Sequence, residues 1–196
     1  MRVLSVFFTR TSMIETSLAA QQTRQWLETI VVGLNLCPFA GPVLKADGVH
    51  IDVCPAEQDQ AIIAAVLEQL DQLQQTDEST IATSLLVFSN GLKDFDQYWS
   101  LVEVANELLQ QVGLEGVIQI ASFHPDYCFE GVPEEDVSHY TNRSPYPMLH
   151  FIREAQLSRA LGNYPQPELI PDNNIRKLQA LGKPALLKLL AMESTS

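Results

Sequence analysis

Three short runs of apolar and β-branched residues, separated by two helix-length segments, most constrain the fold of this chain. The runs at residues 49–54, 84–88 and 117–123 each have the length of a strand. The segments between them, at residues 56–75 and 95–112, have the length and apolar periodicity of helices. Strands joined by helical crossovers usually lie parallel, with helices on the sheet faces. The sequence therefore predicts an α/β fold with a mainly parallel β-α-β-α-β sheet of three or four strands.

Helices are also expected on both sides of this region. Residues 18–34 have the apolar spacing of an amphipathic helix. Residues 144–161 are expected to form a second helix, with Ser144 as its N-cap. Residues 172–192 supply one or two additional C-terminal helices.

The domain organisation follows from these segments. An apolar run at residues 3–8 is shorter than the roughly 7–15 residues of a signal-peptide core, and we interpret it as part of an extension. We expect an N-terminal extension over residues 1–17, a single α/β domain over residues 18–192 and a frayed tail over residues 193–196.

Charge and cysteine content limit the partners. The 196 residues include 12 basic and 24 acidic side chains, giving a formal net charge of -12. This charge opposes binding to nucleic acid and to anionic membranes. No stretch approaches the roughly 20 apolar residues of a membrane span. Three widely spaced cysteines do not suggest a disulfide framework. We expect a cytoplasmic protein that binds neither nucleic acid nor membrane.

The polar segment at residues 124–143 is the first candidate site. Long irregular connections in compact domains are often functional, and α/β sheets bind ligands beyond the carboxyl ends of their strands. His124 directly follows a buried run, and an imidazole titrates near neutral pH. We predict that His124 is a general acid or base. The alternative is a structural histidine that hydrogen-bonds the loop.

Cationic and amide side chains beside the expected 144–161 helix predict a site for an anionic ligand, a carboxylate or a phosphate. Arg143 and Arg153 are expected to clamp the anion, because guanidinium groups suit planar oxyanions. Prolines 145 and 147 remove backbone amides, so the helix start alone is a poor anion site. The other expected ligand-binding residues are Asn142, Ser144, Tyr146 and His150.

A structural role is the alternative for both arginines. In so acidic a chain, they are also expected to find carboxylate partners within the loop. The acidic residues concerned are Glu130, Glu134, Glu135 and Asp136.

Cys37 is a candidate nucleophile, and its alternative is a buried structural cysteine. Cys128 could join His124, His139 or His150 in a metal site. No H-E-x-x-H or paired C-x-x-C motif supports such a site, and G-x-S-x-G, Walker and Rossmann patterns are absent. The sequence therefore assigns no metal ligands and identifies no cofactor.

Three strings stand out in the sequence: GLNLCPFA from Gly33, ASFHP from Ala121 and TNRSPYPMLHFIRE from Thr141. Taken together they resemble the domain of unknown function 1415 family, a group of bacterial proteins. The resemblance brings no reaction with it. It places these residues in motif positions: Cys37, His124, Asn142, Arg143, Ser144, Pro145, Tyr146, Pro147, His150 and Arg153. Cys128 departs from the family pattern, which weakens a metal site that needs it.

The functional expectation is a small-molecule-binding protein or enzyme. Its polar site is expected within residues 123–153 and its ligand is expected to be anionic. One alternative is a metal-binding protein that uses His124, His150 and a cysteine. Another is a non-catalytic protein whose polar loop docks a partner. The sequence leaves the oligomeric state open.

Overall fold

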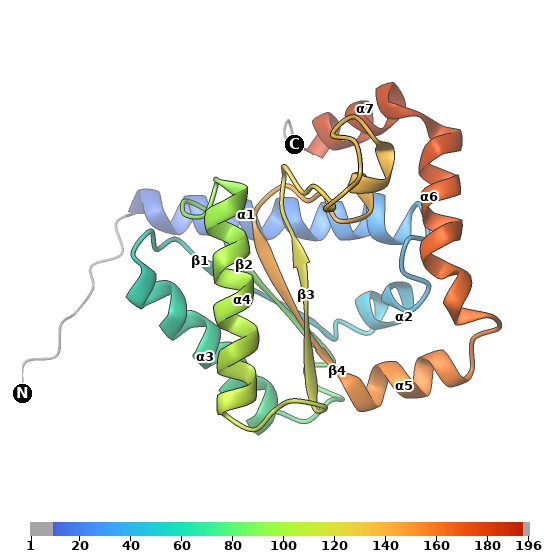
Figure 1. Cartoon of the computed structure of the whole chain (residues 1–196). Helices are drawn as coiled ribbons and strands as arrows, with labels where there is room; N and C mark the ends of the chain where they lie inside the picture. The colour runs from blue at the N-terminus through green and yellow to red at the C-terminus, as the bar shows by residue number, and fades with distance from the viewer. Residues whose placement is uncertain (1–9, 194–196) are drawn as a thin grey trace, which may run out of the picture.

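Four strands form one sheet, and they are β1 (Val49–Cys54), β2 (Thr83–Phe88), β3 (Ile118–Phe123) and β4 (Met148–Arg153). The structure is a computed structural model that describes residues 10–193. The spatial order is β1-β2-β4-β3 (Figure 1). The α/β class and the first three strands are therefore confirmed.

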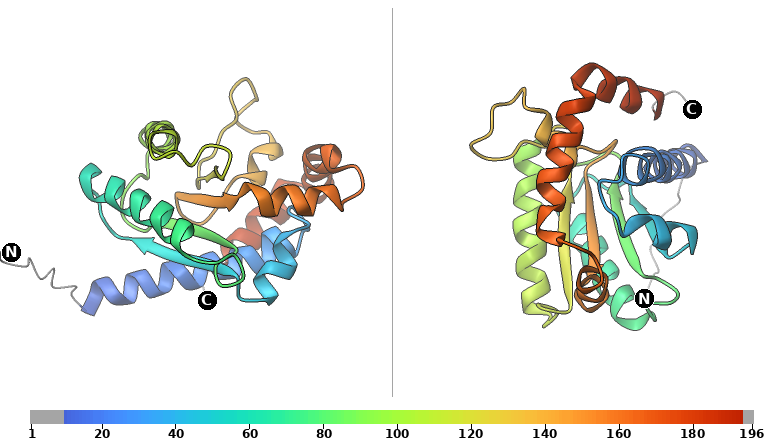
Figure 2. Two further views of the ribbon diagram at one scale, coloured as in Figure 1. Left: turned by 90° about the horizontal axis from the view of Figure 1, so that it is seen from below. Right: turned by 90° about the vertical axis from the view of Figure 1, so that its right-hand side faces the viewer.

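Helices cover both faces of this sheet. In Figures 1 and 2, α3 and α4 lie over one face and α1 crosses the other. No helix within residues 10–193 is long and apolar enough to span a membrane. The α-helices are α1 (Arg10–Trp26), α2 (Ala40–Lys45), α3 (Asp59–Gln75), α4 (Phe95–Gln111), α5 (Glu154–Gly162), α6 (Ile170–Leu181) and α7 (Lys183–Glu193). A π-helix (Leu27–Val32) continues α1, and two 3-10 helices cover Val137–Thr141 and Pro167–Leu169.

The expected domain boundaries stay a prediction. The α1 helix begins at Arg10 and so crosses the boundary expected between residues 17 and 18. Most of the expected extension, residues 1–9, and most of the expected tail, residues 194–196, lie outside the described residues.

The helix expected over residues 144–161 is wrong in its first part. Met148–Arg153 is strand β4, and a helix begins only at Glu154. Ser144 is not an N-cap, because its hydroxyl donates to the Tyr146 carbonyl oxygen (2.6 Å). The Pro147 carbonyl oxygen instead accepts a hydrogen bond from the Phe88 amide. A short apolar run that is buried on both faces does not distinguish a strand from a helix by periodicity.

The expectation of a mainly parallel sheet is also wrong. Only β1 and β2 pair parallel, whereas β4 pairs antiparallel with both β2 and β3. Strands β2 and β3 share a direction, as the helical crossover requires, but β4 lies between them. This error follows from the helix wrongly expected at residues 148–153. Without β4, the sequence predicts only strands that run in the same direction.

Two apolar cores lie on the two faces of the sheet. On one face, Leu86 and Phe151 pack with residues of α3 and α4. On the other face, Val87 and Met148 pack with α1 residues such as Trp26. Because β2 and β4 are central and covered on both sides, their sequences are largely apolar and lack a strict polar–apolar alternation.

The hydroxyl of Tyr98 connects β3 and β4 at the end of the sheet that carries the long polar loop. Tyr98 is fully buried in α4, and its hydroxyl accepts from the Phe123 amide (2.9 Å). The same hydroxyl donates to the Met148 carbonyl oxygen (2.9 Å). Burial raises the pKa of Tyr98, so the phenol keeps the proton that it donates.

Replacing Tyr98 by Phe should therefore destabilise the fold. The change leaves the Phe123 amide and the Met148 carbonyl without this partner, which typically costs about 1–3 kcal/mol. Urea denaturation followed by circular dichroism measures the loss. Trp99→Phe is the matched control, because Trp99 is on the same helix and 41% exposed. An unchanged free energy of unfolding in Tyr98→Phe would contradict the bridging role.

Candidate functional site

His124 lies in the core at the end of β3, and its ring is engaged on both sides. The residue is fully buried, with Phe95 and Tyr98 against its ring. Its Nδ1 accepts from the Asp126 amide (3.0 Å), so Nδ1 carries no proton. Its Nε2 is 3.0 Å from the Leu92 carbonyl oxygen, to which it must donate. Both contacts select the neutral imidazole with its proton on Nε2.

This arrangement fixes the loop that leads into α4. Leu92 has a φ of 60°, a backbone conformation that costs energy in a residue with a bulky side chain. Burial lowers the pKa of His124 and favours the neutral ring that holds Leu92. The bonds match the alternative reading of a histidine that ties the loop together, and the acid–base role stays a prediction.

His139 repeats the same pattern within the long loop. It is fully buried, its Nδ1 accepts from the Phe129 amide (3.0 Å), and its Nε2 donates to the Pro133 carbonyl oxygen (2.8 Å). The Cys128 sulfur lies 3.7 Å from Nε2. Because that nitrogen carries the proton, it cannot take one from the thiol. Sequence reasoning considered His139 only as a metal ligand and missed this structural role.

His150 and His124 belong to opposite faces of the sheet. His124 contacts Tyr98 in the core under α4, whereas His150 contacts Phe123 in the core under α1. Among the residues that the structure describes, no three His, Cys, Asp or Glu side chains are placed to hold a metal ion. The alternative that uses His124, His150 and a cysteine together has no geometric basis in this region.

His150 participates in a partly buried hydrogen-bonded chain. Thr83 uses its hydroxyl proton for the Phe151 carbonyl oxygen (2.7 Å). It therefore accepts from Nε2 of His150 (2.6 Å). Burial lowers the pKa of His150 to about 4, so the ring is neutral at physiological pH. A neutral, sheet-embedded ring is poorly suited to bind an anion.

Arg153 lies far from Arg143, so the expected clamp does not form. Arg143 precedes β4 and Arg153 is its last residue, and six strand residues span about 20 Å. Arg153 donates to the carbonyl oxygens of Thr76 (2.6 Å) and Ile81 (3.2 Å). It thereby connects the end of β4 to the segment between α3 and β2.

Arg143 is held on one side and available on the other. Its Nε donates to the Tyr127 carbonyl oxygen (3.2 Å), and its guanidinium carbon lies 4.5 Å from the centre of the Tyr140 ring. Within residues 10–193, ion pairs join Arg24 to Asp47 and Arg159 to Glu78. The described residues provide no hydrogen-bond or ion-pair partner for the terminal nitrogens of Arg143. The expected pairing with the acidic loop residues is not observed there.

Arg143 lines a hollow of about 360 Å³. The hollow brings together the end of β3, the segment before β4, α1 and α7. The Tyr146 hydroxyl donates to the Gln22 side chain across it. Its lining includes Gln22, Pro125, Ser144, Pro145, Tyr146 and Leu190. Three predicted ligand-binding residues, Arg143, Ser144 and Tyr146, therefore share one hollow.

Cys37 and Asn142 line a different hollow of about 520 Å³. Asn142 donates to the Ser122 carbonyl oxygen (3.1 Å), which holds the loop against β3. Phe123 contributes to the same lining. Each of the three motif strings thus contributes to this hollow, although they are far apart in the chain.

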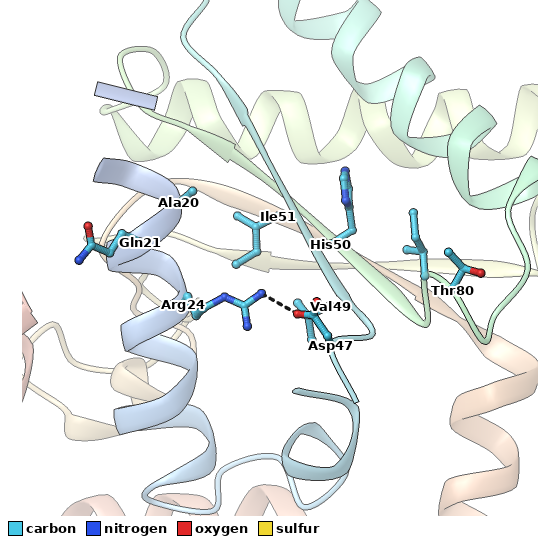
Figure 3. A pocket seen from close by; sticks show the side chains of 9 residues that line it. Ala20, Gln21, Arg24, Asp47, Val49, His50, Ile51 and Thr80 are labelled. Carbon is cyan, nitrogen blue, oxygen red and sulfur yellow. Dashed lines mark hydrogen bonds and ion pairs between the residues drawn. The ribbon is translucent and has the colours of Figure 1, made fainter. Parts of the chain in front are cut away.

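A third hollow, beside β1, contains an arginine whose charge is paired. It has a volume of about 510 Å³ and lies between α1 and β1. Figure 3 shows Arg24 pointing at Asp47, with which it forms an ion pair of 3.2 Å. Both side chains are well exposed, so the pair contributes little to stability. Its charge is matched, unlike that of Arg143.

Several residues that shape the site escaped prediction. Tyr140 is three residues before Arg143 in a 3-10 turn, a spacing that could have indicated the contact between them. Tyr127 contributes a backbone oxygen, and such a contact leaves no side-chain signal. Gln22 reaches the hollow from α1, and only the tertiary fold brings it there.

Comparison with known proteins gives one match. A family model described as "Protein of unknown function (DUF1415)" matches residues 18–188 of the chain. No curated protein and no solved structure matches it.

His150, embedded in the central strand β4, makes stability depend on pH. The folded-state pKa of about 4 is below the ordinary 6.5, so the unfolded chain binds more protons below pH 6.5. The contribution of His150 is present above pH 6.5 and is lost as the pH falls towards 4. The two values correspond to at most roughly 3 kcal/mol. His124, whose pKa is also lowered, acts in the same direction.

Replacing His150 by Gln should flatten this dependence, because an amide can still donate to Thr83 but does not titrate. Free energies of unfolding in urea from pH 7.5 to pH 4 measure the effect. His50→Gln is the control, because it removes a histidine from the edge strand β1 instead of the central strand β4. If His150→Gln and the unchanged protein lose stability in parallel, His150 is not the titrating group.

Proposed function

The chain belongs to the family described as "Protein of unknown function (DUF1415)", and we propose that it binds a small anionic ligand, a carboxylate or a phosphate, through Arg143. The ligand lies in the hollow that Arg143 shares with Ser144 and Tyr146. The hollow, at about 360 Å³, is of the size that small ligands occupy in proteins.

The position of the Arg143 side chain carries this proposal. Its Nε and one face of its guanidinium are occupied by Tyr127 and Tyr140, so little side-chain entropy remains to be lost on binding. The terminal nitrogens form the part of the guanidinium fork that binds planar oxyanions in pairs. A fixed arginine with open terminal nitrogens is the arrangement expected of an anion-binding residue.

We propose binding rather than catalysis because of where the two candidate catalytic residues, His124 and Cys37, lie. Both ring nitrogens of His124 are engaged by backbone groups. Cys37 lines a hollow that differs from the one lined by Arg143. Neither residue is placed to act on a ligand held by Arg143, so the proposed role of this site is recognition.

The other residues expected to bind the anion have structural roles in this proposal. Arg153 and His150 support the sheet, through Thr76, Ile81 and Thr83. Asn142 positions the segment that carries Arg143, because it donates to Ser122 on β3. The ligand therefore meets one guanidinium, which favours a small monoanionic group or one face of a phosphate.

Isothermal titration calorimetry with inorganic phosphate and with succinate tests the proposal. At least one of the two should bind, and Arg143→Ala should abolish the binding. Arg143→Lys should weaken it by about tenfold or more, because an ammonium lacks the planar fork. Arg176→Ala is the matched control, because Arg176 is an exposed arginine on α6.

Circular dichroism must show that the Arg143 variants are folded, since Arg143 also contacts Tyr140. Equal binding by Arg143→Ala and the unchanged protein would overturn the proposal. Failure of both anions to bind the unchanged protein would overturn it as well.

A further inference from the structure

We propose that the hollow lined by Cys37 is a second binding site, which takes a small, uncharged and largely apolar molecule. Nothing in the proposed anion site requires it, since Arg143 does not line it. Its volume of about 520 Å³ falls within the range of small-ligand sites.

The walls are mainly apolar and come from four parts of the chain. They are the segment after α1, the end of β3, the long loop and the start of α6. The apolar side chains include Val31, Phe123, Phe129, Val132, Ile170 and Ile175. All six are only partly buried. Apolar surface gathered in a concave site is unfavourable in water and gains free energy when an apolar ligand covers it.

Among the residues that the structure describes, no charged side chain lines this hollow. Its polar residues use their donors within the protein, so they leave few unpaired groups for a polar ligand. Thr141 donates to Ser138 or Asn142, and Asn174 donates to Leu36. A charged ligand would lose its hydration without gaining a counter-charge, which is strongly unfavourable. The lining therefore selects uncharged molecules.

Hydrogen bonds hold the walls in place, so the hollow is preformed. On one side, Asn174 and Lys177 of α6 donate to carbonyl oxygens of residues 34–36. On the other side, His139 holds the loop through Phe129 and Pro133. The bonds from α6 connect two walls to each other, and the bonds of His139 connect parts of the loop. The apolar side chains therefore cannot move inward and fill the hollow.

Cys37 provides a reporter within the site. It is half-buried and lines the hollow, whereas Cys54 is buried at the end of β1. The remaining thiol, Cys128, is half-buried beside His139. In a Cys128→Ser background, an uncharged thiol reagent should therefore react at Cys37.

The test uses N-phenyl-1-naphthylamine, an uncharged apolar fluorophore, on the full chain. Its fluorescence should rise saturably, with one molecule bound per chain. In the Cys128→Ser background, the bound fluorophore should slow the reaction of Cys37 with 4,4′-dithiodipyridine. At ten times its dissociation constant the slowing should be about tenfold, because only unoccupied protein reacts.

Two variants fill the hollow from different walls. Ile175→Trp acts from α6 and Val132→Trp acts from the loop, and each should abolish fluorophore binding. Leu187→Trp is the matched control, because Leu187 is 48% exposed on α7 and outside this hollow. Inorganic phosphate should leave fluorophore binding unchanged, which separates this site from the anion site.

Two results would overturn the proposal. One is unchanged fluorophore binding in both filling variants, with circular dichroism showing that they are folded. The other is fluorophore binding that leaves the reaction rate of Cys37 unaltered. If one filling variant fails to fold, the second variant and the Cys37 reaction still decide whether the hollow binds the fluorophore. Failure of the anion ligands to bind Arg143 would leave this site unaffected.

Discussion

The insertion of β4 between β2 and β3 determines where every other feature of the molecule lies. The strand pairs antiparallel with both neighbours, with Leu149 opposite Leu86 and His150 opposite Ala121. Because β3 ends where β4 begins, residues 124–147 must leave and return at the same end of the sheet. This constraint gathers the long loop, Arg143 and both adjoining hollows at the carboxyl ends of β1, β2 and β3.

A loop of this length needs internal bonds, and two buried histidines supply them. In both His124 and His139, Nδ1 accepts a hydrogen bond from a backbone amide and Nε2 donates one to a backbone carbonyl oxygen. A neutral imidazole can satisfy one donor and one acceptor at once, as a peptide group does within a strand or helix. Here the rings replace the regular hydrogen bonds that the loop lacks, and thereby keep its backbone groups satisfied.

The sequence predicts those parts of the fold whose local pattern has one interpretation. The run at Val49–Cys54 and the helix beginning at Phe95 have such patterns, and both are confirmed. Met148–Arg153 does not, because a central strand covered on both faces lacks the alternation that identifies a strand. That one misassignment also produced the expected N-cap at Ser144 and the expected clamp, since a helix would have brought residues 143 and 153 within three turns.

The sequence predicts where a candidate site should lie but not the contacts of its residues, and the site itself stays a prediction. The choice of the polar segment after β3 and of Arg143 follows from strand ends and residue types. The partners of Arg143 could not be predicted, because one is a backbone oxygen of Tyr127 and the other is a ring face of Tyr140. Likewise, the ring bonds of His124 depend on Leu92, which lies in a different loop.

The two proposed sites share a wall, and this gives them a physical connection. The segments at residues 123–125 and 142–143 run side by side, joined by the bond from the His124 amide to the Asn142 carbonyl oxygen (3.2 Å). Asn142 lines the apolar hollow, and its neighbour Arg143 lines the polar one. Two adjacent residues thus line two different hollows, so one strip of backbone separates the hollow with the Arg143 charge from the uncharged one. The buried ring of His124 anchors this backbone to the core, which fixes the position of both hollows relative to the sheet.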